Sequence, residues 1–570
     1  MELKQVRGAL NFSNDGVGAR DLQALFRGSP VRLDIDTRAQ RKIGKVVDFR
    51  LSGQFGAAAL FGAQAAAFAP YLQGQSDWDV LLSVPERRPG VPGAVQIKLD
   101  SDLGGMAVQL PQPLAKTGKA KRAFSARIAI TESALDLSLE YAPDVRAVLV
   151  LARSAKTVRL TRGELRIASG DAKLPAEPGL KIVARLPHLD LAMLGAGSAL
   201  PIPVSGVDAR IDEIGLAGAV LRDTQVQMQP RAGALAIRLT GKDVAGTLQV
   251  PTEARASQPL QIRLERLALR RTTGRETADD GGAARDGDPR QWPPLEVDIG
   301  ELFVNDRSLG RLHFATAPTA QGLRLRELQL RSDWHQLSVE GDWRITADGA
   351  SSRLQAQFAS RELGRSLAAF GYELALAKGD AKAQATLAWP GGFADFSLAA
   401  LQGQLKLHIG KGQLLQVDPG MGRVIGLLNL YALTRRLQLD FSDLFEDGLA
   451  FDEISGRLDF GNGKAQIDHL TLSGPAAQIA VGGSLDLQHK RFDQTIAVMP
   501  RLGAPLALAG AVAGGPVVGA AVLVAEQLLK PGIGKIVRYQ YQVTGPWDDP
   551  VVERDGGAPG DHSATSGFKR

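Results

Sequence analysis

Apolar and polar residues alternate with a period of two along most of the chain. Clear examples are residues 337–345, 354–358, 405–409 and 479–487. This period is typical of β-strands that bury one face. A sheet of many strands must curl, split or flatten. We therefore predict a mainly β fold, in which a long, curled antiparallel sheet forms an apolar groove, with an ordinary β-sandwich core as the alternative. A few short helices are expected, mostly near the C-terminus.

A second pattern interrupts the alternation with two mainly polar residues between apolar positions. It occurs at residues 265–266, 300–301, 326–327, 452–453 and 468–469. In a regular strand this spacing would move the following apolar residues to the opposite face. A β-bulge absorbs one residue and keeps both halves on the same face. We predict bulges or sharp bends at these steps, with a tight turn between two short strands as the alternative.

Three short helices are expected from local composition and caps. The first two lie within residues 55–72, which are rich in alanine, and within 361–372. The third starts at Asp418, which can cap a helix, with Pro419 in the first turn. Its apolar face consists of Val424, Leu427, Leu428 and Tyr431.

Residues 502–525 form the longest nearly uncharged segment. The length is sufficient for a membrane span. However, Pro505, Pro516 and several glycines would break a straight helix. A buried apolar hairpin, a spanning helix and a segment that touches or enters a membrane all remain open.

Polar segments divide the chain. Residues 272–291 are predicted to be a disordered surface insertion, and 554–570 a disordered tail. The expected domains are a β-groove segment at 1–271 and a second one at 292–417. A C-terminal region at 418–553 contains the third helix and the 502–525 segment.

Composition excludes several classes of function. The 570 residues include no cysteine, which rules out disulfides, thiolate zinc sites and cysteine nucleophiles. The net charge of +6 is a weak bias for this length, and basic residues are not clustered with aromatic ones, so no nucleic-acid partner is expected. Six tyrosines and six tryptophans are too few for the aromatic girdles of an outer-membrane barrel.

No catalytic or metal-binding constellation is found. The seven histidines lack metal-ligand spacing. The acidic cluster of Asp440, Asp443, Glu446 and Asp447 lacks the pattern of a calcium loop and is interpreted as a solvated helix end. We expect no enzymatic activity, no metal and no cofactor. A carbohydrate-active enzyme with carboxylates from distant positions is not excluded by sequence.

The C-terminal third contains several short motifs in a specific order. They are residues 412–420 (GQLLQVDPG), 426–430 (GLLNL), 435–441 (RRLQLDF), 474–477 (GPAA), 514–516 (GGP) and 545–548 (GPWD). Residues 101–104 (SDLG), 110–114 (LPQPL) and 389–391 (WPG) extend the similarity upstream. In these motifs the chain resembles the AsmA-like proteins of the large YhdP type.

The resemblance implies a non-enzymatic, bridge-like transporter in the periplasm of Gram-negative bacteria. Such proteins move phospholipid between the inner and outer membranes. Family chains are longer and carry an inner-membrane anchor, so this chain is expected to match their C-terminal portion, with its C-terminus towards the outer membrane. The implied partners are phospholipids, both membranes and envelope proteins. An outer-membrane or secreted β-structural protein is the alternative.

Candidate lipid-binding residues follow from the alternation combined with this resemblance. They are Leu323, Leu325, Leu328, Leu330, Leu337, Val339, Leu405, Leu407, Ile467, Leu470 and Leu472. The candidates for contact with a membrane or a partner protein are Val424, Leu427, Leu428, Tyr431, Leu508, Val517, Val518 and Val522. From the alternation alone, the core of an ordinary β-sandwich is the favoured interpretation of the first set, and the resemblance reverses this preference.

Overall fold

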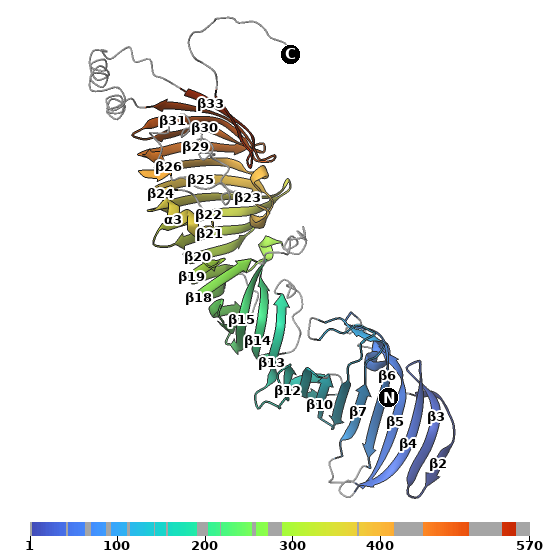
Figure 1. The fold of residues 1–570 in the computed structure, drawn as a ribbon. Helices are drawn as coiled ribbons and strands as arrows, with labels where there is room; N and C mark the ends of the chain where they lie inside the picture. Colours follow the sequence, from blue (N-terminus) through green and yellow to red (C-terminus); the bar gives the residue numbers. More distant parts are fainter. Residues whose placement is uncertain are drawn as a thin grey trace, which may run out of the picture. The chain divides into compact units, whose positions relative to one another are not determined.

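The computed structural model shows a mainly β protein with few short helices, as the sequence predicts (Figure 1). The chain divides into two compact units. Unit 1 comprises Met1–Ala254 and Glu265–Ala284, and unit 2 comprises Arg255–Leu264 and Arg285–Arg570. The structure describes residues 3–40, 44–62, 70–86, 93–110, 114–141, 143–154, 158–190, 203–216, 218–252, 258–271, 288–372, 376–414, 449–500 and 539–554.

Unit 1 is a curled sheet built from the strands β1 to β17. Strand β18 (Leu260–Arg271) crosses the boundary between the units. The strands are β1 (Leu3–Arg7), β2 (Leu10–Ser13), β3 (Gly16–Phe26), β4 (Ser29–Gln40), β5 (Gly44–Gly56), β6 (Leu72–Pro85), β7 (Val95–Ser101), β8 (Met106–Val108), β9 (Phe124–Ile130), β10 (Ala134–Tyr141), β11 (Val145–Arg153), β12 (Val158–Ile167), β13 (Gly179–Asp190), β14 (Val204–Leu216), β15 (Ala219–Arg231), β16 (Ala234–Thr240) and β17 (Val244–Pro251).

The sheet of unit 1 is mixed, which corrects the expectation of a purely antiparallel sheet. Strand β13 pairs in parallel with both β12 and β14, whereas β12 pairs with β11, and β14 with β15, in antiparallel orientation. Between β12 and β13 the chain returns through residues 168–178 rather than through a tight hairpin. The period-two alternation specifies the buried face of a strand but carries no information on strand direction.

One face of unit 1 is packed around a hydrophobic cluster. Leu51 and Phe55 of β5 are 1% exposed, as is Met106 of β8. Phe55 meets Phe26 edge to face, with their ring centroids 5.7 Å apart. Alternate residues of the same strands face solvent, so the unit buries one side of its sheet.

Unit 2 contains an antiparallel sheet in which each strand pairs with its neighbour in chain order, apart from the strands of a small second sheet. The large sheet consists of β19 (Leu295–Val304), β20 (Arg307–Thr319), β21 (Gly322–Arg331), β22 (His335–Thr346), β23 (Gly349–Ser360), β25 (Ala381–Pro390), β26 (Gln402–Ile409), β29 (Glu453–Gly461), β30 (Lys464–Ser473), β31 (Ala477–Asp486), β32 (Arg491–Pro500), β33 (Tyr539–Pro546) and β34 (Val551–Arg554). The small sheet consists of β24 (Leu376–Lys378), β27 (Gly412–Leu414) and β28 (Leu449–Phe451).

The described α-helices are short. The helix predicted within residues 361–372 is confirmed as α3 (Leu363–Ala369). Within 55–72 the described residues include the helix α1 (Ala57–Phe61), which follows directly on β5, and the start of β6 at Leu72. Three 3-10 turns are also seen: η3 (Pro289–Gln291), η4 (Phe393–Asp395) and η5 (Leu398–Ala400).

Several predicted segments lie outside the described residues. They are the helix from Asp418, the segment 502–525, the tail and most of the 272–291 insertion. The end of that insertion forms η3, where Asp288 accepts a hydrogen bond from the backbone N–H of Arg290. In the part of the chain that is described, no helix has both the length and the hydrophobicity needed to span a bilayer.

Candidate functional site

The β-bulges of unit 2 keep apolar side chains on one face of the sheet. The register of β21 against β22 shifts between Leu325 and Leu328, as predicted. A shift between Ile467 and Leu470 on β30 confirms the second bulge of this kind. The same is seen on β19, between residues 299 and 302. The extra residue in each bulge compensates for the two-residue step, so the apolar residues on either side stay on the same face.

The remaining two steps take other forms. At 452–453 the chain bends sharply, because β28 belongs to the small sheet and β29 to the large one. At 265–266 the strand β18 is continuous, and Leu264 and Leu267 on either side of the step are both buried.

A glycine lies opposite the bulge in β21 and lets β22 approach β23 closely. Gly341 lies directly opposite Leu325. A Cβ atom at this position would lie 2.2 Å from the carbonyl oxygen of Arg353 and 2.6 Å from the side chain of Leu354. Glycine therefore allows β22 and β23 to approach, and Leu354 fills the space beside it.

Residues directly opposite each other in antiparallel strands point to the same face. The strand registers connect the apolar residues of unit 2 into continuous cross-strand rows. One row contains Leu330, Leu337, Phe358, Ala383, Leu407, Gly456, Leu470, Val481, Ile496 and Tyr541. The adjacent row contains Leu328, Val339, Ala356, Ala385, Leu405, Leu458, Ile467, Gly483, Gln494 and Val543.

The eleven candidate lipid-binding residues all lie on this one apolar face. Eight are members of the two rows, and the other three belong to it by their spacing on β21 and β30. We call the part on β22, β23, β25 and β26 the half-exposed stretch, because Leu337, Val339, Leu405 and Leu407 are only half-buried. On β21, Leu328 is also half-buried, whereas Leu323, Leu325 and Leu330 are buried.

The part of the face on β29 to β33, the buried stretch, is covered. Ile467 is 1% exposed, Leu470 2% and Leu472 3%. The hydrophobic cluster around them includes Leu363 of α3 and Phe451 of β28. The helix α3 and the small sheet thus pack onto the same side of the large sheet as the buried stretch. Figure 1 shows α3 and β24 at one edge of the large sheet, beside β22 and β25.

The opposite face of the large sheet is polar. Lys406, between Leu405 and Leu407, is exposed, as is Arg326 in the bulge of β21. On β29, Arg457 donates hydrogen bonds to Asp459, which lowers the pKa of that carboxyl group. The sheet of unit 2 therefore separates an aqueous face from an apolar one.

Several polar side chains are buried on the apolar face, among them His335 and Gln494. His335 at the start of β22 is 3% exposed and lies between the rings of Phe358 and Phe370. Its Nε2 atom is 3.2 Å from the carbonyl oxygen of Leu309, whereas Nδ1 has no hydrogen-bond partner. Burial lowers the pKa of this imidazole. Gln494 on β32 is 2% exposed and its amide nitrogen has no partner.

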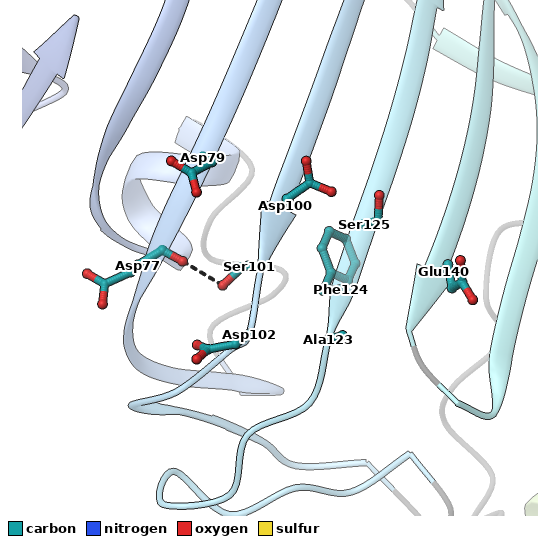
Figure 2. Close-up of a pocket in the computed structure, with 9 residues that line it drawn as sticks. All are labelled: Asp77, Asp79, Asp100, Ser101, Asp102, Ala123, Phe124, Ser125 and Glu140. Carbon is teal, nitrogen blue, oxygen red and sulfur yellow. Dashed lines mark hydrogen bonds between the residues drawn. The ribbon is translucent and has the colours of Figure 1, made fainter.

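Unit 1 contains a polar hollow of about 650 Å³ at the ends of its strands (Figure 2). Ser101 donates a hydrogen bond of 2.7 Å to the backbone carbonyl of Asp77 there. The residues lining it are Asp77, Asp79, Asp100, Ser101, Asp102, Ala123, Phe124, Ser125 and Glu140.

The carboxylates of this hollow are largely engaged with neighbouring cations. Asp100 pairs with Lys98 at 2.6 Å, and Asp102 with Lys121 at 2.8 Å. The hydrogen bond from Lys121 lowers the pKa of Asp102. Among the described residues, no group of histidine, aspartate and glutamate side chains is arranged to hold a metal ion. The hollow is a solvated, ion-paired surface.

The candidate contact residues in the C-terminal region lie outside the described residues. These are Val424, Leu427, Leu428, Tyr431, Leu508, Val517, Val518 and Val522. Sequence reasoning also omitted several residues of the apolar face, notably Phe358, Ala383, Ala385 and Trp343. The alternation along β22, β23 and β25 would have identified them, since each occupies the apolar phase of its strand.

Comparison with known proteins places these features in a family. The model of the YhdP protein family matches residues 1–552. The chain belongs to the YhdP family. It is 23% identical over 566 residues to the intermembrane phospholipid transporter YhdP of Escherichia coli strain K12. This alignment covers 96% of the chain and 44% of the relative, so the chain spans less than half of that protein's length. No solved structure matches the chain.

Proposed function

We propose that this YhdP-family chain forms part of a bridge for phospholipid transport between the inner and outer membranes. The observation that carries the proposal is the apolar face of unit 2. Its cross-strand rows run without a break from β21 to β33, and the side chains between β22 and β26 are half-buried. The name of the Escherichia coli relative supports the choice of phospholipid as the cargo.

The physical basis is a division of the lipid between two environments. Acyl chains would lie against the leucine, valine and alanine side chains of a groove on the apolar face, and the polar head groups would stay in water at the edge of the sheet. Each methylene removed from water contributes ~0.8 kcal/mol, so a two-chain lipid is held strongly. Because the contacts are non-directional, the lipid is free to slide from one strand to the next.

The proposed process is non-enzymatic and uses no cofactor. The polar hollow of unit 1 is ion-paired, and the apolar face of unit 2 offers packing surface rather than reactive groups. We place the chain in the periplasm, with its C-terminus towards the outer membrane. Phospholipids, both membranes and envelope proteins are the proposed partners.

A matched pair of substitutions on β26 tests the proposal. Leu407 is half-buried on the apolar face, and its neighbour Lys406 is exposed on the polar face. We expect L407D to reduce the phospholipid that co-purifies with the chain by roughly tenfold, because a carboxylate next to acyl chains costs more than ~1.4 kcal/mol. K406D, which places the same group on the other face, should leave the yield unchanged.

Native mass spectrometry of the purified protein measures the bound lipid. Circular dichroism of both variants establishes that the sheet is retained. The proposal fails if neither the natural chain nor any variant carries phospholipid, which is the result expected from an ordinary sandwich core. It also fails if L407D and K406D carry as much lipid as the natural chain.

A further inference from the structure

Aromatic side chains gather at one end of the strands of unit 2. Trp343 is three residues from the end of β22, and Trp389 is one residue from the end of β25. Both tryptophans lie on the apolar face of the sheet. Trp343 is directly opposite Leu323 of β21 and Ser352 of β23, and Ser352 is in turn directly opposite Trp389. The apolar face therefore ends in tryptophans at this edge.

Three more aromatic rings extend this edge, and we call the five together the aromatic rim: Trp292, Trp343, Trp389, Phe393 and Phe396. Trp292 meets Trp343 edge to face at 5.7 Å between ring centroids, and Phe393 lies 6.2 Å from Trp343. Phe396 meets Trp389 at 5.2 Å. Trp292 is 43% exposed and Phe396 is 50% exposed, so the rim faces solvent although its inner members adjoin the apolar face.

The local backbone is shaped to hold Trp343. Gly392 packs against its ring, and a Cβ atom at this glycine would lie 2.9 Å from the ring carbon Cζ2. The side chain of Asp395 accepts a hydrogen bond of 2.7 Å from the backbone N–H of Gly392. The loop after β25 is thus fixed in a conformation that leaves space for the indole.

The two tryptophans differ in their hydrogen bonding. The indole N–H of Trp389 donates to the carbonyl oxygen of Gly392 at 2.9 Å. The indole N–H of Trp343 is covered but has no acceptor. A buried donor without a partner is unfavourable, and the cost is relieved when an acceptor arrives.

The two edges of the sheet also differ. At the end opposite the aromatic rim, α3 packs against the hydrophobic cluster through Leu363, and Phe370 covers His335. That edge is covered by protein, whereas the aromatic rim remains exposed. Tryptophan combines a large apolar ring with one polar donor and favours the boundary between hydrocarbon and water.

We propose that the aromatic rim binds the glycerol–ester region of a phospholipid, with the indole N–H of Trp343 donating to an acyl ester carbonyl. The acyl chains then extend across the apolar face of β22, β23 and β25, and the head group lies in water outside the rim. This assignment rests on the proposed function and deepens it, because it specifies which edge of the sheet holds the head groups.

The ester carbonyl is the appropriate partner because Trp343 offers a donor and no acceptor. Lipids that lack this carbonyl but are otherwise matched provide the test. A phosphatidylcholine with two ester-linked chains is compared with its ether-linked analogue of the same chain length. Binding of each to the full chain is measured by competition with a fluorescent phospholipid.

The natural chain should bind the ester-linked lipid about two- to tenfold more tightly than the ether-linked one, as expected for one neutral hydrogen bond. W343F keeps the ring but removes the donor, so it should bind the two lipids equally. W334F is the control, because Trp334 is a 38% exposed tryptophan outside the aromatic rim, and it should retain the preference.

The comparison within the natural chain does not depend on how well any variant folds. Equal binding of ester- and ether-linked lipid by the natural chain overturns this assignment while leaving the proposed function intact. Retention of the preference in W343F also overturns it. Failure of the natural chain to bind either lipid overturns the proposed function as well.

Discussion

The half-exposed stretch and the buried stretch of unit 2 belong to one sheet and share its apolar rows, yet they differ in what covers them. On β22 to β26 the leucines and valines are half-buried. On β29 to β33, Ile479 and Tyr541 are completely buried, and α3 and β28 contribute to the same cluster. Similar alternating sequences thus provide an accessible apolar surface in one place and a conventional core in the other.

Apolar side chains of this sheet have two roles, which are to stabilise the fold and to offer surface to a ligand, and the two stretches separate these roles. In the buried stretch, side chains stabilise the fold through contacts with other protein groups. In the half-exposed stretch, the same side chains leave part of their surface without protein contact, and this surface is available to a ligand. We therefore expect Ile467, Leu470 and Leu472 to contribute mainly to stability, and Leu337, Val339, Leu405 and Leu407 to contribute mainly to lipid binding.

Truncating one leucine in each stretch should give the largest difference in the free energy of unfolding between the two stretches. L470A removes a side chain that is 2% exposed and should lower the free energy of unfolding by about 2–5 kcal/mol, because a cavity remains. L337A removes a half-buried side chain and should cost about 1 kcal/mol, since less apolar area leaves a protein environment. Urea denaturation followed by circular dichroism measures both.

Lipid binding by the same two variants should change in the opposite order. L337A is expected to reduce co-purifying phospholipid more than L470A does. Equal losses of stability in the two variants would show that the two stretches are packed alike, and the distinction drawn between them would be wrong.

Replacing one alanine in each stretch by leucine should give a smaller difference in stability between the two stretches. Ala465 on β30 is fully buried, so A465L should overpack the cluster and cost about 1–3 kcal/mol. Ala385 on β25 is half-buried, and A385L should change stability by less than about 0.5 kcal/mol. The midpoints of thermal unfolding distinguish the two. A clear destabilisation by A385L would indicate that the face above β25 is already filled.

The sequence predicted the strands and the faces of unit 2 with good accuracy. The two-residue steps at 300–301, 326–327 and 468–469 were confirmed as bulges, because a bulge is the local way to keep apolar residues on one side. All eleven candidate lipid-binding residues fall on a single face for the same reason. Face and register are local properties of a strand, and alternation encodes them directly.

Features that depend on distant parts of the chain were not predictable. Leu328 and Leu470 follow the same pattern in sequence, but only Leu470 is buried. The parallel pairing of β13 was missed because direction depends on the connections between strands. The tryptophans of the aromatic rim are 51 and 46 residues apart along the chain, so no local motif joins Trp292, Trp343 and Trp389. Whether an apolar face is covered is decided by tertiary contacts.

The covered edge of the half-exposed stretch should respond to pH through His335. This residue is on β22, at the edge where Phe370 covers it, and burial lowers the pKa of its imidazole in the folded state. The neutral form is therefore favoured by folding. Its contribution to stability is complete above the unfolded pKa of ~6.5 and is lost as the pH falls through the lower folded pKa. We expect the free energy of unfolding to fall as the pH is lowered from 7 to 5.

The variant H335L should lose this part of the pH dependence, because no titratable group remains between Phe358 and Phe370. The exposed His469 provides the control, and H469Q should keep the slope of the natural chain. Urea titrations at a series of pH values measure the slopes. A slope in H335L equal to that of the natural chain would mean that α3 does not hold His335 in an apolar environment, and the covered edge of the sheet would then be as accessible as the aromatic rim.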